Sequence, residues 1–267
     1  MNSLELARSI RLSALRMVHA ANASHIGSCL SLTDILAVLY GRVMQVDPAR
    51  PAWAARDRLI VSKGHASAAV YSALAAVRFI DPAELADYGK DGSRLMAHVS
   101  HKVPGVEMSS GSLGHGLPFG VGKALAARQL GAAWGVYVLL SDGEMDEGSN
   151  WEALMFAGHH GLDNLTAVID YNKYQSLDTV AATLVLEPLG AKLAAFGWDV
   201  AEVDGHDHEA LAAALTRNTQ GRPRAVVAHT IKGKGVSFME GKVEWHYRSP
   251  NAELLAQALA EVERGHA

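Results

Sequence analysis

Two polar residues follow buried strands of this sequence at positions that could bind a metal ion. Asp142 ends the apolar segment GVYVLLSD, and Asn172 closely follows the apolar segment LTAVID. One expected helix separates the two segments, so we predict that they are neighbouring strands of a right-handed βαβ unit. The carboxyl ends of such strands open at the same edge of the sheet, where ligands bind. Carboxylate and amide oxygens are hard ligands, and together they predict a site for Mg²⁺ or Ca²⁺.

These two ligands leave the coordination of a Mg²⁺ ion incomplete, and water or phosphate oxygens must supply the rest. The main-chain carbonyl of Tyr174, just past Asn172, is the candidate third protein ligand. Gly143 allows a phosphate to approach the backbone, and a helix that starts near Glu147 or Ser149 adds an electropositive end. The residues thus predict a metal-bridged diphosphate site. The alternative is that Asp142 and Asn172 only shape turns.

The composition of the chain limits its partners and its compartment. Among 267 residues, 24 Lys and Arg stand against 28 Asp and Glu, and the formal charge of −4 argues against nucleic acid or an anionic membrane as the main partner. Cys29 is the only cysteine, which excludes an internal disulfide and fits a reducing compartment. The N-terminus carries charges throughout, unlike a signal peptide, and no apolar run is long enough for a transmembrane helix. We therefore expect a cytoplasmic protein.

Hydrophobic periodicity indicates which elements hold the polar residues in place. The first part of the chain predicts a helix over residues 3–20, a second helix that begins near Ser31 or Thr33, a strand over Arg58–Ser62 and an alanine-rich helix over 66–77. Residues 81–118 are rich in turn-forming residues and favour a long functional loop. From about residue 120 onward, we predict strands over 135–142, 165–170, 198–203 and 224–230 and helices over 119–131, 147–161, 188–197, 208–218 and 251–267.

This alternation of strands and helices is typical of βαβ units. It predicts the α/β class, with a doubly wound, mostly parallel sheet that carries helices on both faces. No linker divides the chain, so we expect a single domain over residues 1–267.

The passage from Asp142 to Asn172 resembles the thiamine diphosphate signature, in which Gly-Asp-Gly is followed by Asn after a βαβ unit, although Ser141 replaces the first glycine. Six segments, in order along nearly the whole chain, are similar to the N-terminal, diphosphate-binding domain of transketolases. They are SHIGSCLSLTDILAVLY, DRLIVSKGHASAAVYSALA, PGVEMSSGSLGHGLPFGVGKALA, SDGEMDEGSNWEALMFAGHHGLDNLTAVIDYNKYQS, FGWDVAEVDGHD and HTIKGKGVSFMEGKVEWH. The resemblance implies a domain that binds thiamine diphosphate with Mg²⁺ or, as a substitute, Ca²⁺.

The resemblance implies roles for four histidines. His25, in SHIGS, is similar to the histidine that binds a substrate hydroxyl. His65, in SKGHA, is similar to the one that contacts cofactor phosphate and substrate, and His246, in EWH, to the one near substrate and diphosphate. The segment AHVSHKVPGVE fits a fourth site histidine at His98, with His101 as the alternative. Neutral imidazoles suit this chemistry because they accept and return hydroxyl protons near pH 7.

Further site residues follow from the same resemblance. Gly111, Ser112 and Leu113 match the loop that passes over the cofactor, and Ser112 stands where proline is common. Glu147 matches an acidic residue that links the paired active sites of transketolases. The cofactor-binding set implied by the resemblance is completed by His65, Asp142, Gly143, Asn172 and His246.

The implied activity is the transfer of a two-carbon ketol unit from a ketose phosphate, or a similar anionic ketose, to an aldose. The thiazolium of the cofactor supplies the electronic chemistry, and the protein orients it. One alternative is a half-subunit of a 1-deoxyxylulose-5-phosphate synthase-like or 2-oxoacid dehydrogenase-like enzyme, and another is a non-catalytic regulatory homologue. His25, His65 and His246 favour sugar substrates over a simple 2-oxoacid. The donor and acceptor sugars stay open.

The expected partner follows from what a transketolase has beyond this domain. Its pyrimidine-binding domain supplies the glutamate that activates the cofactor, whereas this sequence ends one predicted helix after His246. We therefore expect the N-terminal subunit of a split transketolase, inactive without a separate C-terminal subunit that carries the pyrimidine-binding domain. Two of each subunit in a heterotetramer is the simplest closed arrangement.

Overall fold

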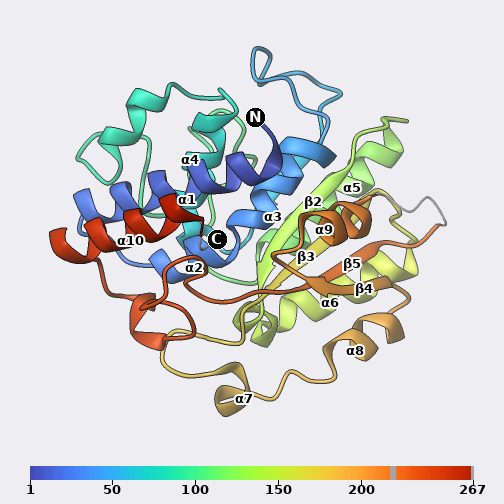
Figure 1. Ribbon diagram of the computed structural model, residues 1–267. Coiled ribbons are helices and arrows are strands. Elements are labelled where there is room, and N and C mark those ends of the chain that lie inside the picture. Colours follow the sequence, from blue (N-terminus) through green and yellow to red (C-terminus); the bar gives the residue numbers. More distant parts are fainter. Residues whose placement is uncertain (217–220, 266–267) are drawn as a thin grey trace.

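The computed structural model describes residues 1–216 and 221–265, which contain one parallel sheet of five strands (Figure 1). The strands lie in the order β1-β2-β3-β5-β4, and β2 and β3 are parallel neighbours. The prediction that Asp142 and Asn172 leave adjacent strands is therefore confirmed. The bounds are β1 (Arg58–Val61), β2 (Val136–Ser141), β3 (Leu165–Tyr171), β4 (Asp199–Asp204) and β5 (Arg224–His229).

Helices cover both faces of this sheet and form a separate apolar core on each. The first core lies under α1 (Ser3–Ala20), α2 (Ile26–Ser31), α3 (Thr33–Val38), α4 (Ser67–Ala76), α9 (His208–Leu215) and α10 (Ala252–Arg264). The second core lies under α5 (Gly116–Gln129), α6 (Gly148–His159) and α8 (Leu189–Ala195). The short helix α7 (Val180–Thr183) lies between β3 and β4 in the chain. The predicted doubly wound α/β fold is confirmed.

The second predicted helix is α3, which begins at Thr33 as expected, but a short helix that was not predicted, α2, precedes it. Helical structure starts at Ile26, Leu32 separates the two helices, and α3 passes into a π-helical turn over Leu39–Val43. The hydroxyl groups that suggested an N-cap have other partners. Thr33 Oγ1 donates to a carbonyl one turn back, and Ser31 Oγ donates to the Asp170 carboxylate at 2.6 Å. The start at Thr33 is confirmed, but neither hydroxyl caps the helix, because both serve buried contacts.

The other predicted elements are found within a few residues of their expected ends. The helix expected over 208–218 ends at Leu215, and its last two predicted residues lie outside the described part of the chain. The predicted C-terminal helix is α10, and residues 266–267 of that prediction also lie outside it. Within 81–118, a 3₁₀ turn over Pro82–Asp87 interrupts the expected loop before α5 starts at Gly116. No helix among the described residues is long and apolar enough to cross a membrane.

Close packing of α5 on β2 helps to hold the edge of the sheet in place. A Cβ atom added at Gly120 of α5 would lie 2.4 Å from Val138 Cγ2, far inside van der Waals contact. The helix backbone therefore rests directly on the strand, which ends at Ser141 beside Asp142.

Candidate active site

A polar cavity of about 300 Å³ lies beyond the carboxyl ends of β1, β2 and β3. A larger cavity of about 490 Å³, beside α6 and α8, is lined mainly by apolar side chains and holds none of the predicted site residues. The polar cavity is therefore where the candidate chemistry is concentrated. The predicted residues that line it are His25, His65, His98, Gly111, Leu113, Asp142, Gly143, Asn172, Tyr174 and His246.

The two predicted metal ligands lie together at this edge, and both are buried, with 1% of Asp142 and 4% of Asn172 exposed. The Asp142 carboxylate accepts hydrogen bonds from the main-chain N–H of Gly143, at 2.8 Å, and from that of Lys173. Burial, and after it the negative charge of Asp170, raises the pKa of Asp142 to about 7. A cation beside Asp142 would favour its ionised form.

The donor set suits a metal ion only if another ligand shares it. Among the described residues, no group of three or more His, Cys, Asp or Glu side chains is arranged so that it could hold a metal ion by itself. The Asp142 carboxylate, the Asn172 amide oxygen and the Tyr174 carbonyl are three hard oxygens at one cavity. Mg²⁺ prefers six such ligands and commonly takes the others from water and phosphate. The residues therefore fit a Mg²⁺ ion bound together with a diphosphate.

Two fully buried lysines at this site were missed by the sequence analysis. Lys63 Nζ donates to the Asp170 carboxylate, and Lys232 Nζ lies 3.0 Å from His246 Nδ1. Burial, and after it the charge of Lys63, lowers the pKa of Lys232 to about 8. Two ammonium groups suit an anionic ligand. A signal was present, because Lys63 stands in SKGHA with His65 and Lys232 stands in the glycine-rich segment HTIKGKG.

Four imidazoles surround the cavity, with His25 at their centre. The ring centroid of His25 lies 5.0 Å from those of His65 and His246 and 6.0 Å from that of His98. Burial, and after it neighbouring positive groups, lowers the pKa of His25 to about 4 and that of His246 to about 3. Burial also holds the pKa of His65 well below its usual value. These three rings are therefore neutral at pH 7.

The backbone places His25 in an uncommon conformation. Its φ of 74° is in the left-handed region, directly before α2 begins. Its N–H donates to the carbonyl of His246 at 2.7 Å, which joins two segments of the site that are far apart in the sequence. Strained backbone of this kind persists where surrounding contacts hold it, often at functional sites.

The structure separates the two candidates for the fourth histidine. His98 lines the cavity, whereas the exposed His101 donates to or accepts from Ser109 Oγ at 2.7 Å and does not line it. Ser112 and Glu147 do not line the cavity either. Glu147 is the exposed N-cap residue of α6, so its role as a link between paired active sites stays a prediction.

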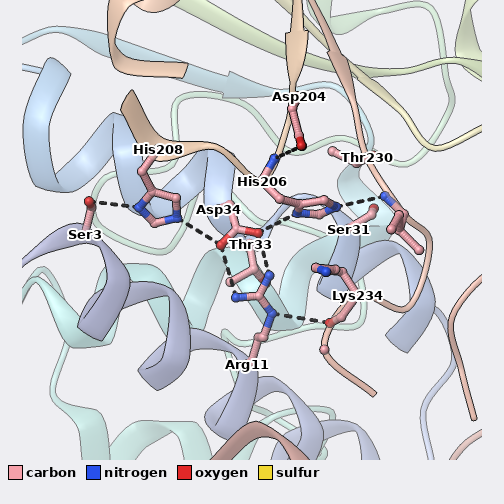
Figure 2. Close-up of polar contacts among 12 residues, drawn as sticks. Ser3, Arg11, Ser31, Thr33, Asp34, Asp204, His206, His208, Thr230 and Lys234 are labelled. Carbon is pink, nitrogen blue, oxygen red and sulfur yellow. Dashed lines mark hydrogen bonds and ion pairs between the residues drawn. The ribbon is translucent and has the colours of Figure 1, made fainter. Parts of the chain in front are cut away.

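A buried polar network fixes the segment that follows β5 (Figure 2). Asp34 on α3 accepts hydrogen bonds from Arg11 on α1 and from His206 and His208 before and at the start of α9. His206 Nε2 accepts from the main-chain N–H of Ile231 at 2.9 Å, so the ring proton is on Nδ1 and faces Asp34. The network thus ties the start of this segment to two helices of the first core.

Comparison with known proteins finds similar chains over almost the whole length. Residues 3–262 match the family described as "Transketolase, thiamine diphosphate binding domain". One of the subunits of the apulose-4-phosphate transketolase of Phocaeicola vulgatus is 42% identical over 250 residues, which are 93% of this chain and 89% of that protein. The 6-deoxy-6-sulfo-D-fructose transketolase subunit SqwG of Clostridium sp. (strain MSTE9) is 41% identical over 262 residues, or 97% of this chain and 95% of that protein.

Solved structures show the same similarity in three dimensions. The transketolase of Campylobacter jejuni has a TM-score of 0.92 and 31% identity, over 98% of this chain and 43% of that one. The transketolase of Leishmania mexicana has a TM-score of 0.92 and 30% identity, over 100% of this chain and 42% of that one. This chain therefore spans about two fifths of those solved transketolases, but nearly the full length of the two relatives named as subunits.

Proposed function

Since this chain belongs to the transketolase family and matches its thiamine diphosphate binding domain, we propose that it is the N-terminal subunit of a two-subunit transketolase. The enzyme transfers a two-carbon ketol unit from an anionic ketose to an aldose. The single observation that carries this proposal is the cluster of neutral imidazoles at the same cavity as the Asp142 and Asn172 oxygens.

The cofactor end of the site is proposed to hold a Mg²⁺ ion, for which Ca²⁺ could substitute. Asp142, Asn172 and the carbonyl of Tyr174 would bind the ion, and diphosphate oxygens would complete its coordination. The buried charge of Lys63 and a hydrogen bond from His65 would favour the diphosphate at this position. When bound, thiamine diphosphate supplies the carbon nucleophile and the electron sink that cleavage next to a carbonyl requires.

The substrate end is proposed to use His25, His98 and His246. Because the rings of His25 and His246 are neutral at pH 7, both can hydrogen-bond to sugar hydroxyls, and His25 can accept a hydroxyl proton at its unprotonated nitrogen. His25 is the best placed to take up and return the proton of a sugar hydroxyl, since it lies closest to two of the other rings. A cavity with several such groups suits a polyol better than a simple 2-oxoacid.

The substrate class is proposed to be ketoses that carry a negatively charged group. The names of the two relatives specify apulose 4-phosphate and 6-deoxy-6-sulfo-D-fructose, a phosphorylated and a sulfonated sugar. For this chain we propose only the feature that the two sugars share, which is an anionic group. The buried lysines beside the cavity support an anionic ligand on this chain's own evidence.

The rest of the site is proposed to come from a separate C-terminal subunit that carries the pyrimidine-binding domain. Support comes from the match, over nearly their full length, to relatives named as transketolase subunits. Two copies of each subunit, related by a two-fold axis, would close the assembly. The lone cysteine, Cys29, supports a cytoplasmic location.

Calorimetric titration of thiamine diphosphate into the complex of this chain and its partner, with and without Mg²⁺, tests the proposal. We expect binding only with Mg²⁺, and none in Asp142→Ala, because that change removes the charged metal ligand. His25→Ala should bind the cofactor normally but lose about 100-fold in ketol transfer, as expected for loss of a proton-transferring group. Retained Mg²⁺-dependent binding in Asp142→Ala would refute the metal site.

The matched control is His101→Ala, which removes an exposed imidazole outside the cavity. It should leave cofactor binding and ketol transfer unchanged. A loss in this variant equal to that of His25→Ala would mean that the cavity histidines have no special role.

A further inference from the structure

Lys232 is a buried ammonium group behind the cavity, and three acceptors surround it. Its Nζ lies 2.8 Å from the carbonyl of Gln175, 3.0 Å from His246 Nδ1 and 3.4 Å from the carbonyl of Tyr174. An ammonium group has three N–H donors and no lone pair, so the number of acceptors matches the number of donors. The side chain is fully buried and has no access to water as a substitute partner.

The backbone on both sides of Lys232 is held in place. The N–H of Ile231 donates to His206 Nε2 at 2.9 Å, and the N–H of Gly233 donates to the carbonyl of Gly27 at 3.0 Å. A Cβ atom at Gly27 would come 3.2 Å from Lys232 Cγ, so the aliphatic part of the lysine packs tightly against α2. The ammonium group therefore has little freedom to move away from the His246 ring.

The contact between Lys232 and His246 determines where the imidazole proton lies. Because the ammonium group can only donate, His246 Nδ1 must accept, and the proton of the neutral ring must then be on Nε2. The carbonyl of Gln175 also interacts with the ring as an acceptor. The same carbonyl accepts from Lys232 Nζ at 2.8 Å, and its two lone pairs allow it to serve both the ring and the ammonium group.

We propose that Lys232 is a positioning residue that holds His246 in the Nε2–H tautomer, so that His246 faces the ligand as a hydrogen-bond donor. Its two contacts with the carbonyls of Tyr174 and Gln175 hold the segment after Asn172 against the same ring. A donor at this position stabilises negative charge on a sugar oxygen as it develops. The effect on turnover rests on the proposed function, whereas the tautomer itself does not.

The tautomer is measured directly by long-range ¹H–¹⁵N NMR of the full chain, labelled with ¹⁵N-histidine, at pH 7. His246→Gln identifies the His246 signals by their loss. We expect wild type to show an unprotonated Nδ1 and a protonated Nε2. Lys232→Met, whose side chain is unbranched and one heavy atom shorter and has no donor, should move the ring to the Nδ1–H tautomer or a mixture, and Lys232→Arg should restore the wild-type pattern.

The matched control is Lys234→Met, the same chemical change two residues further along the same segment. Lys234 contributes its main-chain carbonyl to Arg11 at 3.3 Å, and its side chain does not line the cavity. This variant should keep the wild-type His246 tautomer. An Nδ1–H tautomer in the wild-type chain, or an unchanged tautomer in folded Lys232→Met, overturns the inference.

Kinetics of the complex with the partner subunit provide the second readout. Lys232→Met should lower kcat for ketol transfer by about 10- to 100-fold, the range of a single proton-transfer or hydrogen-bonding group. Lys232→Arg should recover most of that loss. If Lys232 had a purely structural role, its substitution would lower the amount of folded protein, and Lys232→Arg would not restore kcat. If the wild-type complex lacks ketol transfer, the proposed function fails, and the NMR experiment still decides the role of Lys232.

Discussion

Single residues of the polar cavity are neutral or charged according to their burial. His25, His65 and His246 have lowered pKa values because burial and nearby cations disfavour a further positive charge. Asp142 has a raised pKa because burial and Asp170 disfavour a further negative charge. The cavity therefore holds neutral imidazoles at one end and, at the other, a carboxylate whose ionised form a cation would favour.

The titration of His25 should follow from this arrangement. Its pKa is lowered from 6.5 to about 4, so the unfolded chain binds more protons than the folded chain between these two pH values. The stabilisation from neutral His25 is thus fully present above pH 6.5 and is lost as the pH falls through that window to 4. The ¹H NMR signal of the His25 ring in the full chain should titrate with a midpoint near 4.

Denaturant unfolding at a series of pH values provides the matched measurement. Stability should fall less steeply between pH 6.5 and pH 4 in His25→Asn than in wild type, because the substituted side chain does not titrate. A midpoint near 6.5 for His25, or the same slope of stability against pH in both proteins, would show that folding does not lower the pKa of the His25 ring.

At the scale of elements, the site depends on segments that reach the sheet edge from both faces. The segment after β5 carries Lys232 and His246, and its start is tied to α1 and α3 through the Asp34 network (Figure 2). Asp34 and Arg11 are 4% and 1% exposed, so water hardly solvates their charges and each charge depends on the other for compensation. The network therefore links the packing of α1 and α3 to the position of the segment that carries Lys232 and His246.

Asp34→Ala should destabilise the folded chain by about 3–5 kcal/mol, because it leaves the Arg11 guanidinium buried without its charged partner. Urea unfolding of the full chain measures this. Asp87→Ala, which breaks the exposed ion pair with Lys90, is the control and should cost less than about 1 kcal/mol. Equal losses in the two variants would mean that burial of the Asp34 network has no energetic consequence.

The stability that Asp34 contributes depends on pH, because its pKa is lowered in the folded chain, unlike that of Asp142. Burial alone would raise the pKa of Asp34, but hydrogen bonds from His206 and His208 and the charge of Arg11 together lower it. The stabilisation is therefore present above the unfolded pKa of 3.8 and is lost as the pH falls below it. In Asp34→Ala this acid-dependent part of the stability should disappear.

At the scale of the whole molecule, this chain provides the proposed metal-binding oxygens and the imidazoles of the proposed site. It spans 43% of the solved transketolase of Campylobacter jejuni, so more than half of that protein has no counterpart in it. The described helices and strands account for both faces of one sheet, with a core on each. The proposed partner subunit would complete the cofactor site at the edge of that sheet.

The isolated chain should therefore show no ketol transfer, even with thiamine diphosphate and Mg²⁺ present, and addition of the C-terminal subunit should restore it. A coupled spectrophotometric assay of the chain, the partner and their mixture measures this. Sedimentation of the active mixture should give a mass of two copies of each subunit. Robust turnover by the chain alone would contradict the two-subunit proposal.

The fold and the pairing of the strands that precede Asp142 and Asn172 could be predicted from the sequence alone. Apolar strands that alternate with helices predict a parallel sheet, and a single helix between the two residues predicts that they leave neighbouring strands. Both expectations depend on contacts between segments close in the chain, and both are confirmed. Ser31 does not cap the helix that begins at Thr33, because its hydroxyl bonds to Asp170, a residue 139 positions away.

Which side chains share the cavity became clear from the packing of the folded chain. The packing selects His98 over His101 and shows that Lys63 and Lys232 are buried, which their motifs SKGHA and HTIKGKG do not reveal by themselves. Lys63 is buried because it pairs with Asp170, 107 positions further along the chain. A lysine or histidine acquires such a role from burial and partners brought together across the sheet edge, and those depend on the packing of distant segments.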